Sequence, residues 1–144
     1  MPASAFPLPD PGDIVYCRFP ESMGKPGPRP RPALVTGLAT LEDGTAAVEV
    51  AYGTSRNTDD LRSGEFLVSH QDGEAYRLAG LSHPTKFNFY RRVVVPYTDE
   101  WFRVPPAPAF GQTPKLGVLH PSLLRRAEAA WKTAQFRRGA STPD

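Results

Sequence analysis

The sequence has almost no cysteine, no long apolar run and no strong excess of either charge. Cys17 is the single cysteine in 144 residues, which excludes an internal disulfide and therefore a disulfide-stapled secreted domain. It lies in an apolar run, where we expect a small buried hydrophobe. No stretch reaches the length of a membrane span, and residues 1–11 are broken by proline and lack the pattern of a signal peptide. We therefore expect a cytoplasmic protein that is not bound to a membrane.

Acidic residues that could hold a metal ion are also sparse. The pairs at 42–43 and 59–60 lie in turn-like segments with no third ligand at a useful spacing. We predict no metal site and no cofactor. The net charge of +2 permits nucleic-acid binding without demonstrating it.

What the sequence does contain is typical of one globular domain. The apolar fraction is 40% and the charged fraction is 22%, over a length of 144 residues that suits a single core. We treat residues 1–144 as one domain with its core at about 10–100. The prolines, 17 in all, cluster in loops at 20–30 and 104–114, and we expect residues 101–120 to form a proline-rich connection.

Short β-branched and aromatic runs alternate with turn signals along the first two thirds of the chain. They predict strands at residues 14–19, 33–38, 46–53, 65–68, 86–90 and 93–95. Helical patterns do not alternate with these strands, so a parallel doubly wound fold is disfavoured. We predict a mostly β fold: a small, antiparallel, SH3-like barrel with a C-terminal α-helix.

The predicted helix covers residues 121–138. Pro121 suits its first turn, and Gly139 is expected to end it, with a frayed tail beyond. We expect this helix to pack over the sheet or against a second subunit, and its charged residues to form a solvated face. Its apolar residues at helical spacing are Leu123, Leu124, Ala127, Ala130, Trp131 and Ala134.

A candidate site comes from two neighbouring strands. Arg31 precedes the strand at 33–38, and Thr54 and Ser55 follow the strand at 46–53. If the two strands pair antiparallel, the start of one lies beside the end of the other. A guanidinium and two hydroxyls would then converge, and that combination suits a phosphate group.

Together these segments form a pattern. Residues 12–15 (Gly-Asp-Ile-Val), a loop with proline and glycine, residues 31–35 (Arg-Pro-Ala-Leu-Val) and a strand ending in Thr54-Ser55 resemble the MazF/PemK-like toxins of bacterial toxin–antitoxin pairs. The resemblance covers residues 10–100. It implies an SH3-like barrel acting as a homodimer, metal-independent cleavage of single-stranded RNA, and an antitoxin partner with an acidic, disordered tail.

The resemblance also implies roles for individual residues. Arg31 and Thr54 occupy the positions of the catalytic pair, and Ser55 is a neighbouring candidate. The general base is not identified by the pattern; His83 is the first candidate and Glu21 the second. The cations expected to contact RNA are Lys25, Arg29, Arg56 and Lys86.

Two other interpretations remain open. The loop at 20–30 lacks, over residues 24–28, the acid and amide that the family usually carries there, which favours a catalytically silent barrel that binds RNA or a protein partner. Its prolines also suit a ligand for an aromatic groove. Tyr52, Phe87 and Tyr90 could stack on bases, although aromatic residues of a barrel are more often core.

Overall fold

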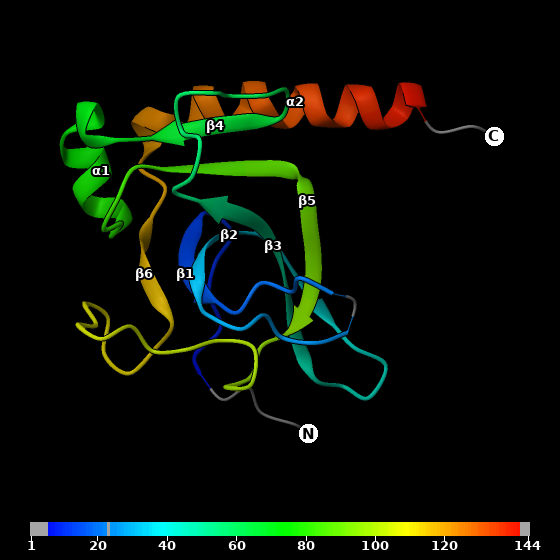
Figure 1. Cartoon of the computed structure of the whole chain (residues 1–144). Coiled ribbons are helices and arrows are strands. Elements are labelled where there is room, and N and C mark those ends of the chain that lie inside the picture. The colour runs from blue at the N-terminus through cyan, green and yellow to red at the C-terminus, as the bar shows by residue number, and fades with distance from the viewer. Residues whose placement is uncertain (1–5, 23, 142–144) are drawn as a thin grey trace.

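The computed structural model describes residues 6–22 and 24–141, with side chains described up to residue 135. Within these ranges a single antiparallel sheet of six strands has the order β4-β5-β3-β2-β1-β6 (Figure 1). The mostly β fold with a C-terminal helix is therefore confirmed. The strands are β1 (Asp13–Cys17), β2 (Arg31–Thr40), β3 (Ala46–Thr54), β4 (Glu65–Val68), β5 (Thr85–Pro96) and β6 (Lys115–Val118).

The sheet curves strongly but does not close. In the described residues its edge strands, β4 and β6, are not paired with each other. The short helix α1 (Glu74–Ala79) lies against β6 instead, where Gly80 and Gly117 let the two backbones approach so closely that a Cβ on either would meet main-chain atoms. The predicted barrel is thus not completed by strand pairing, and α1 fills part of the space between its edges (Figure 1).

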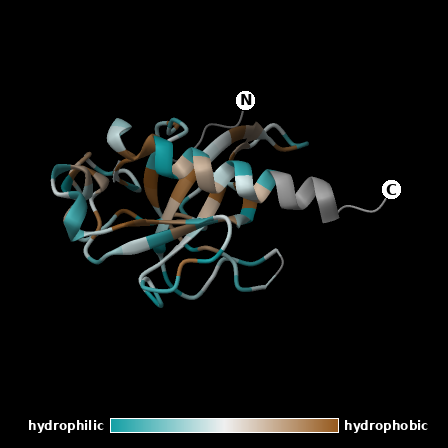
Figure 2. Ribbon diagram, turned by 90° about the horizontal axis from the view of Figure 1, so that it is seen from above, coloured by the Kyte–Doolittle hydropathy of each residue, from teal (hydrophilic) through white to brown (hydrophobic). Residues whose placement is uncertain are grey.

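Apolar side chains are buried on both faces of the sheet. In β1, Ile14 belongs to one core cluster with α2, while Val15 and Cys17 belong to a second cluster with Tyr97 and Phe102. A strand that is covered on both faces has a continuous apolar run in its sequence, without alternation of apolar and polar residues. Figure 2 shows the hydrophobic residues concentrated on the strands below α2.

The C-terminal helix begins later and ends later than predicted. Residues Pro121–Leu123 form a 3₁₀ turn, and α2 runs over Leu124–Ser141, through Gly139. The expected tail beyond the helix falls on residues 142–144, which lie outside the described residues. The predicted stripe is buried at Leu123, Ala127, Ala130 and Ala134 and half-buried at Trp131, whereas Leu124 is 44% exposed.

Three further differences separate the structure from the prediction. The strands expected at 86–90 and 93–95 are one bent strand, β5. The strand β6 lies inside the segment 101–120, which was expected to be a proline-rich connection. The helix α1 was not predicted. In the described ranges, 6–22 and 24–141, no helix has both the length and the apolar character to cross a membrane.

Candidate functional site

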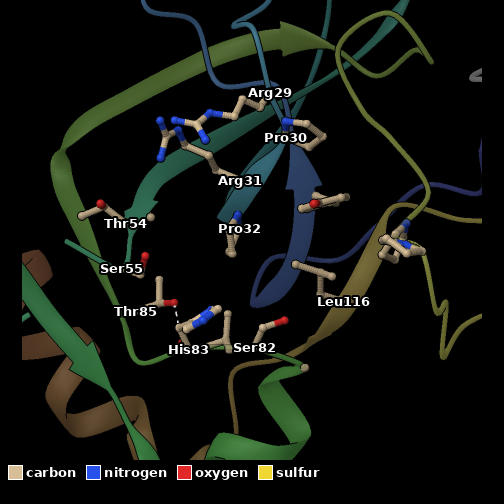
Figure 3. Close-up of a pocket in the computed structure, with 16 residues that line it drawn as sticks. Arg29, Pro30, Arg31, Pro32, Thr54, Ser55, Ser82, His83, Thr85 and Leu116 are labelled. Atoms are coloured by element: carbon tan, nitrogen blue, oxygen red, sulfur yellow. Dashed lines mark hydrogen bonds between the residues drawn. The ribbon is translucent and has the colours of Figure 1, made fainter.

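A hollow of about 470 Å³ opens where β2 begins and β3 ends (Figure 3). It lies between these strands, the connection from α1 to β5, and β6. We call it the arginine pocket. Its principal polar lining residues are Tyr16, Arg29, Arg31, Thr54, Ser55 and His83. The predicted convergence of Arg31 with Thr54 and Ser55 at one rim of the sheet, where β2 begins and β3 ends, therefore corresponds to a cavity.

Local backbone restraints position the two arginines. Arg29 precedes Pro30 and Arg31 precedes Pro32, and a residue before proline is confined largely to extended conformations. The loop that carries Arg29 is fixed further back at Gly27, whose amide donates to the Arg18 carbonyl at 2.9 Å and whose carbonyl accepts from Arg18 Nε at 2.8 Å. This proline loop is thus held to the rest of the domain by hydrogen bonds.

The hydroxyl side of the pocket depends on a close approach of two strands. Gly53 lies so near β2 that a Cβ there would overlap the Pro32 carbonyl oxygen. The next residue, Thr54, accepts a hydrogen bond from the Arg56 amide at 3.1 Å, which orients its Oγ1. Because the amide uses a lone pair of the oxygen, the hydroxyl proton of Thr54 remains available to a ligand.

The lining of the arginine pocket has no carboxylate. Among the described residues, neither Arg29 nor Arg31 forms an ion pair or a side-chain hydrogen bond. Figure 3 shows both side chains extending the same way from the segment that enters β2, with Thr54, Ser55, Thr85 and His83 along the other side. Two unpaired guanidinium groups beside several hydroxyls favour a bound anion, and a planar fork of donors suits phosphate in particular.

His83 comes from the connection between α1 and β5. Its main chain is fixed by Thr85, a buried residue whose Oγ1 donates to the His83 carbonyl at 2.9 Å. Its exposed imidazole makes no hydrogen bond within the described part of the chain. Both ring nitrogens are therefore available to a ligand in the pocket.

The other candidate base, Glu21, is not in the arginine pocket. It is exposed and lines a separate hollow beside Trp101 and the second half of β5. Lys25 is also exposed on the same loop and does not line the arginine pocket. The structure thus brings together four of the predicted residues, Arg31, Thr54, Ser55 and His83, with Arg29 as a fifth.

The two remaining predicted cations line a neighbouring hollow of about 350 Å³, which we call the lateral pocket. Thr54 lines both pockets, so they adjoin. Arg56 is exposed at the lateral pocket. Lys86 is not a free cation: it is 6% exposed, its Nζ lies 3.1 Å from Glu65 Oε1, and it donates to the Asp60 carbonyl at 3.0 Å. Its predicted contact with RNA is therefore replaced by a buried ion pair.

The three candidate stacking residues have different surroundings. Phe87 is fully buried in the core, and Tyr90 packs beside α2, with its hydroxyl 3.4 Å from the Thr133 carbonyl. Tyr52 is covered by Arg91, whose guanidinium carbon lies 4.0 Å from the ring centroid. Of these three residues, Tyr52 lines the lateral pocket, and one face of its ring is already occupied by Arg91.

Three lining residues with polar side chains were missed from the sequence: Tyr16, Ser82 and Thr85. For Tyr16 a signal was available, because a tyrosine within an otherwise buried run keeps its hydroxyl at a polar or open place. For Ser82 and Thr85 there was none, since only the tertiary path of the α1–β5 connection brings them to the pocket. Among the side chains that the structure describes, no group of three or more His, Cys, Asp and Glu residues is arranged to hold a metal ion.

Comparison of the chain with models of protein families gave no match, and neither did comparison with curated protein sequences.

Proposed function

We propose that this protein is a metal-independent endoribonuclease of the MazF/PemK kind, which cleaves single-stranded RNA in the arginine pocket. One observation carries the proposal: Arg29 and Arg31, which have no ion pair among the described residues, line the same pocket as Thr54 and His83, and the lining of that pocket has no carboxylate. Such a pocket suits a phosphodiester, and RNA carries its own nucleophile next to that group, the 2′-hydroxyl.

In the proposed reaction the 2′-oxygen attacks the adjacent phosphorus while the bond from phosphorus to the 5′-oxygen breaks. The 2′-hydroxyl proton passes to a base and the 5′-oxygen takes up a proton, so the products are a 2′,3′-cyclic phosphate and a 5′-hydroxyl. Arg31 stabilises the negative charge that builds on the non-bridging oxygens. Thr54 donates its hydroxyl proton to one of those oxygens and holds the phosphate in line.

His83 is the group in the pocket suited to accept the 2′-hydroxyl proton. It is the single imidazole in the lining, and no carboxylate there competes for that role. General acid–base catalysis by a positioned side chain contributes about 10²–10⁴-fold to the rate. Glu21, in a separate hollow, has no part in the proposed reaction.

The proposal includes the biological setting that the resemblance implies. The protein would act in the cytoplasm as a homodimer, and a cognate antitoxin with an acidic tail would neutralise it. An acidic segment is chemically suited to the arginine pocket, because its carboxylates can take the place of the RNA phosphate on Arg29 and Arg31. Co-purification with the product of a neighbouring gene, and loss of cleavage on adding it, would test this part.

A second candidate function, RNA binding without cleavage, is favoured by one observation. The imidazole of His83 has no hydrogen-bond partner among the described residues that would orient it, whereas catalytic bases are normally oriented by a third group. In that case the arginine pocket would hold a phosphate of the RNA backbone and catalyse nothing.

The first experiment is cleavage of a long single-stranded RNA in EDTA by the wild type, Arg31→Ala and Thr54→Val. Wild-type cleavage should persist in EDTA and leave 5′-hydroxyl ends, and Arg31→Ala should lower the rate by about 10²–10³. Arg125→Ala is the matched control, because Arg125 is an exposed arginine on α2 that lines neither pocket. Equal rates for the wild type and Arg31→Ala would contradict the proposal. Binding without cleavage would establish the second candidate.

The role of His83 has its own test. His83→Gly should lose most of the activity, and added imidazole should restore part of it, because a free base can enter the space left by the side chain. A residue that only supports the loop would not be rescued in this way. Unchanged cleavage by His83→Gly would show that another group accepts the proton.

A further inference from the structure

The lateral pocket adjoins the arginine pocket through Thr54 and has a different character. Its wall combines an aromatic residue, an amide and cations, which are the groups that proteins use to hold a nucleobase and its sugar–phosphate. Its volume of about 350 Å³ falls within the range of small-molecule sites. The residues that matter for this inference are Tyr52, Thr54, Arg56, Asn88 and Arg91.

A bulge in β5 places Arg91 over this pocket. Ala51 of β3 pairs with Arg92, but the next residue, Tyr52, pairs with Asn88, so residues 89–91 are looped out of the ladder at the bend of the strand (Figure 1). Bulges redirect side chains and are frequent beside functional sites. Here the bulge sets the Arg91 guanidinium carbon 4.0 Å from the Tyr52 ring centroid and 5.7 Å from that of Phe19.

The contact with the Tyr52 ring holds the Arg91 guanidinium, which is itself a flat group, in a fixed place. The rings of Tyr52 and Phe19 pack together, with 5.0 Å between their centroids, and support one face of the guanidinium. The Arg91 side chain is exposed and forms no ion pair among the described residues. A guanidinium stacked on one side by an aromatic ring can stack a nucleobase on the other.

Asn88 supplies hydrogen-bond donors close to this surface. It pairs with Tyr52 on one side and with Glu65 on the other, so it lies between two other lining residues of the lateral pocket. Its side-chain oxygen accepts from the Tyr90 amide at 2.8 Å, so the NH₂ group is left for a ligand. The amide can therefore contact the edge of a base.

The charges of the lateral pocket also suit a nucleotide. Its buried acid, Glu65, is neutralised by Lys86 at 3.1 Å, and the exposed Asp60 lies 4.0 Å from Arg62. Arg56 and Arg91 have no acidic partner among the side chains that the structure describes. The pocket thus presents two free cations toward a polyanion.

We propose that the lateral pocket binds the nucleoside next to the phosphate held in the arginine pocket, with its base stacked on Arg91 and its edge facing Asn88. This inference rests on the proposed function, since it uses the same RNA strand. It assigns recognition of one flanking base to Arg91 and Asn88, and leaves the chemistry to the arginine pocket.

The test uses short single-stranded RNAs that carry 2′-deoxyribose at the cleavage site, so that binding is measured without cleavage. An abasic residue is placed in turn at each position flanking that site. For the wild type, one position should be sensitive, with a loss of affinity of about 5- to 150-fold when the base is removed, the range typical of a stacked base. Arg91→Ala should bind the intact RNA more weakly and lose almost nothing further from the same abasic substitution.

Arg91→Lys separates stacking from charge, because lysine keeps the cation without the plane; it should behave like Arg91→Ala at the sensitive position. Arg125→Ala should behave like the wild type. If the abasic RNA loses as much affinity with Arg91→Ala as with the wild type, the inference is overturned and the proposed nuclease is untouched. Binding of these RNAs, combined with failure to cleave the same sequence made entirely of ribonucleotides, overturns the nuclease alone, and failure of the wild type to bind any RNA overturns both.

Discussion

Gly53 marks the closest contact between β3 and β2 at the arginine pocket. A Cβ at this position would overlap the Pro32 carbonyl oxygen and lie 2.9 Å from the Phe87 ring, and both neighbours are rigid. We therefore expect Gly53→Ala to lower the free energy of unfolding by about 1–3 kcal/mol, the usual cost of overpacking. Because the added methyl separates Arg31 from Thr54, cleavage should fall as well.

Urea denaturation with Gly37→Ala as the control checks this prediction. Gly37 lies in the neighbouring strand β2, and a Cβ there would meet only the Glu49 Cβ at an ordinary 3.9 Å. Equal stability of the two variants would mean that the strands can separate at Gly53 without cost.

Lys86 contributes to stability in a different way, because both Lys86 and its ion-pair partner Glu65 are buried. The side chains of Lys86 and Glu65 are 7% and 8% exposed, so removing the lysine leaves a carboxylate buried without its cation. We expect Lys86→Met to destabilise the protein by about 3–5 kcal/mol, as for other broken buried pairs. The double variant Lys86→Met/Glu65→Met should regain part of this loss.

Thermal or urea unfolding measures both variants, with Lys25→Met as the control. Lys25 is exposed, so its replacement should change stability by no more than about 0.5 kcal/mol. A Lys86→Met protein as stable as Lys25→Met would show that Glu65 finds water or another donor.

At the scale of elements, an ion pair joins α2 to the segment after β4. The Arg126 guanidinium binds the Asp72 carboxylate at 3.0 Å through each of its two terminal nitrogens, and it also donates to the Leu67 carbonyl at 2.7 Å. Partial burial alone would raise the pKa of Asp72. The hydrogen bonds from Arg126 and from the Ser69 amide outweigh burial and hold this pKa below its usual value of 3.8.

The sign of the pH dependence follows from that lowered pKa. A carboxylate with a lower pKa in the folded state stabilises the fold above its unfolded pKa, and this contribution is lost as the pH falls through the folded pKa. Asp72→Asn should therefore be less stable than the wild type at neutral pH, by about 1–2 kcal/mol. The difference should shrink below pH 4, whereas Asp59→Asn, in an exposed loop, should show none.

Elements were predictable from sequence where local pattern and tertiary surroundings agree. β4 was placed at residues 65–68 and β3 within one residue, because their apolar runs end at clear turn signals. β6 has four residues, one of them Gly117, and becomes a strand only through pairing with β1. The six-residue helix α1 is too short to show a helical period.

The same division applies to the site. The proximity of Arg31 and Thr54 could be predicted from the sequence, because antiparallel pairing of adjacent strands sets the start of one beside the end of the other. The burial of Lys86 could not be predicted from the sequence, since its ion-pair partner Glu65 comes from another strand. The position of Arg91 depends on a bulge at residues 89–91, and no local signal marks the place where β5 leaves its register with β3.

At the scale of the whole molecule, the reactivity of the Cys17 thiol is a measure of unfolding. Its side chain has no exposed area, and burial raises the pKa of its thiol to about 12. Since the thiolate is the reactive species, we expect iodoacetamide to leave the native protein unmodified near pH 8 and to label it fully in urea. Rapid labelling without urea would contradict a closed core around β1.

The pairing of β1 with β6 has a consequence for the order of events during folding. Asp13 pairs with Val118, whereas β2, β3 and β5 pair with strands that are nearer in sequence. Contacts of high sequence separation form slowly, because a long loop must close first. On the ribosome, one side of β1 would stay without its partner until almost the whole domain had been made. That open edge is the place where we expect a nascent chain to need protection from aggregation.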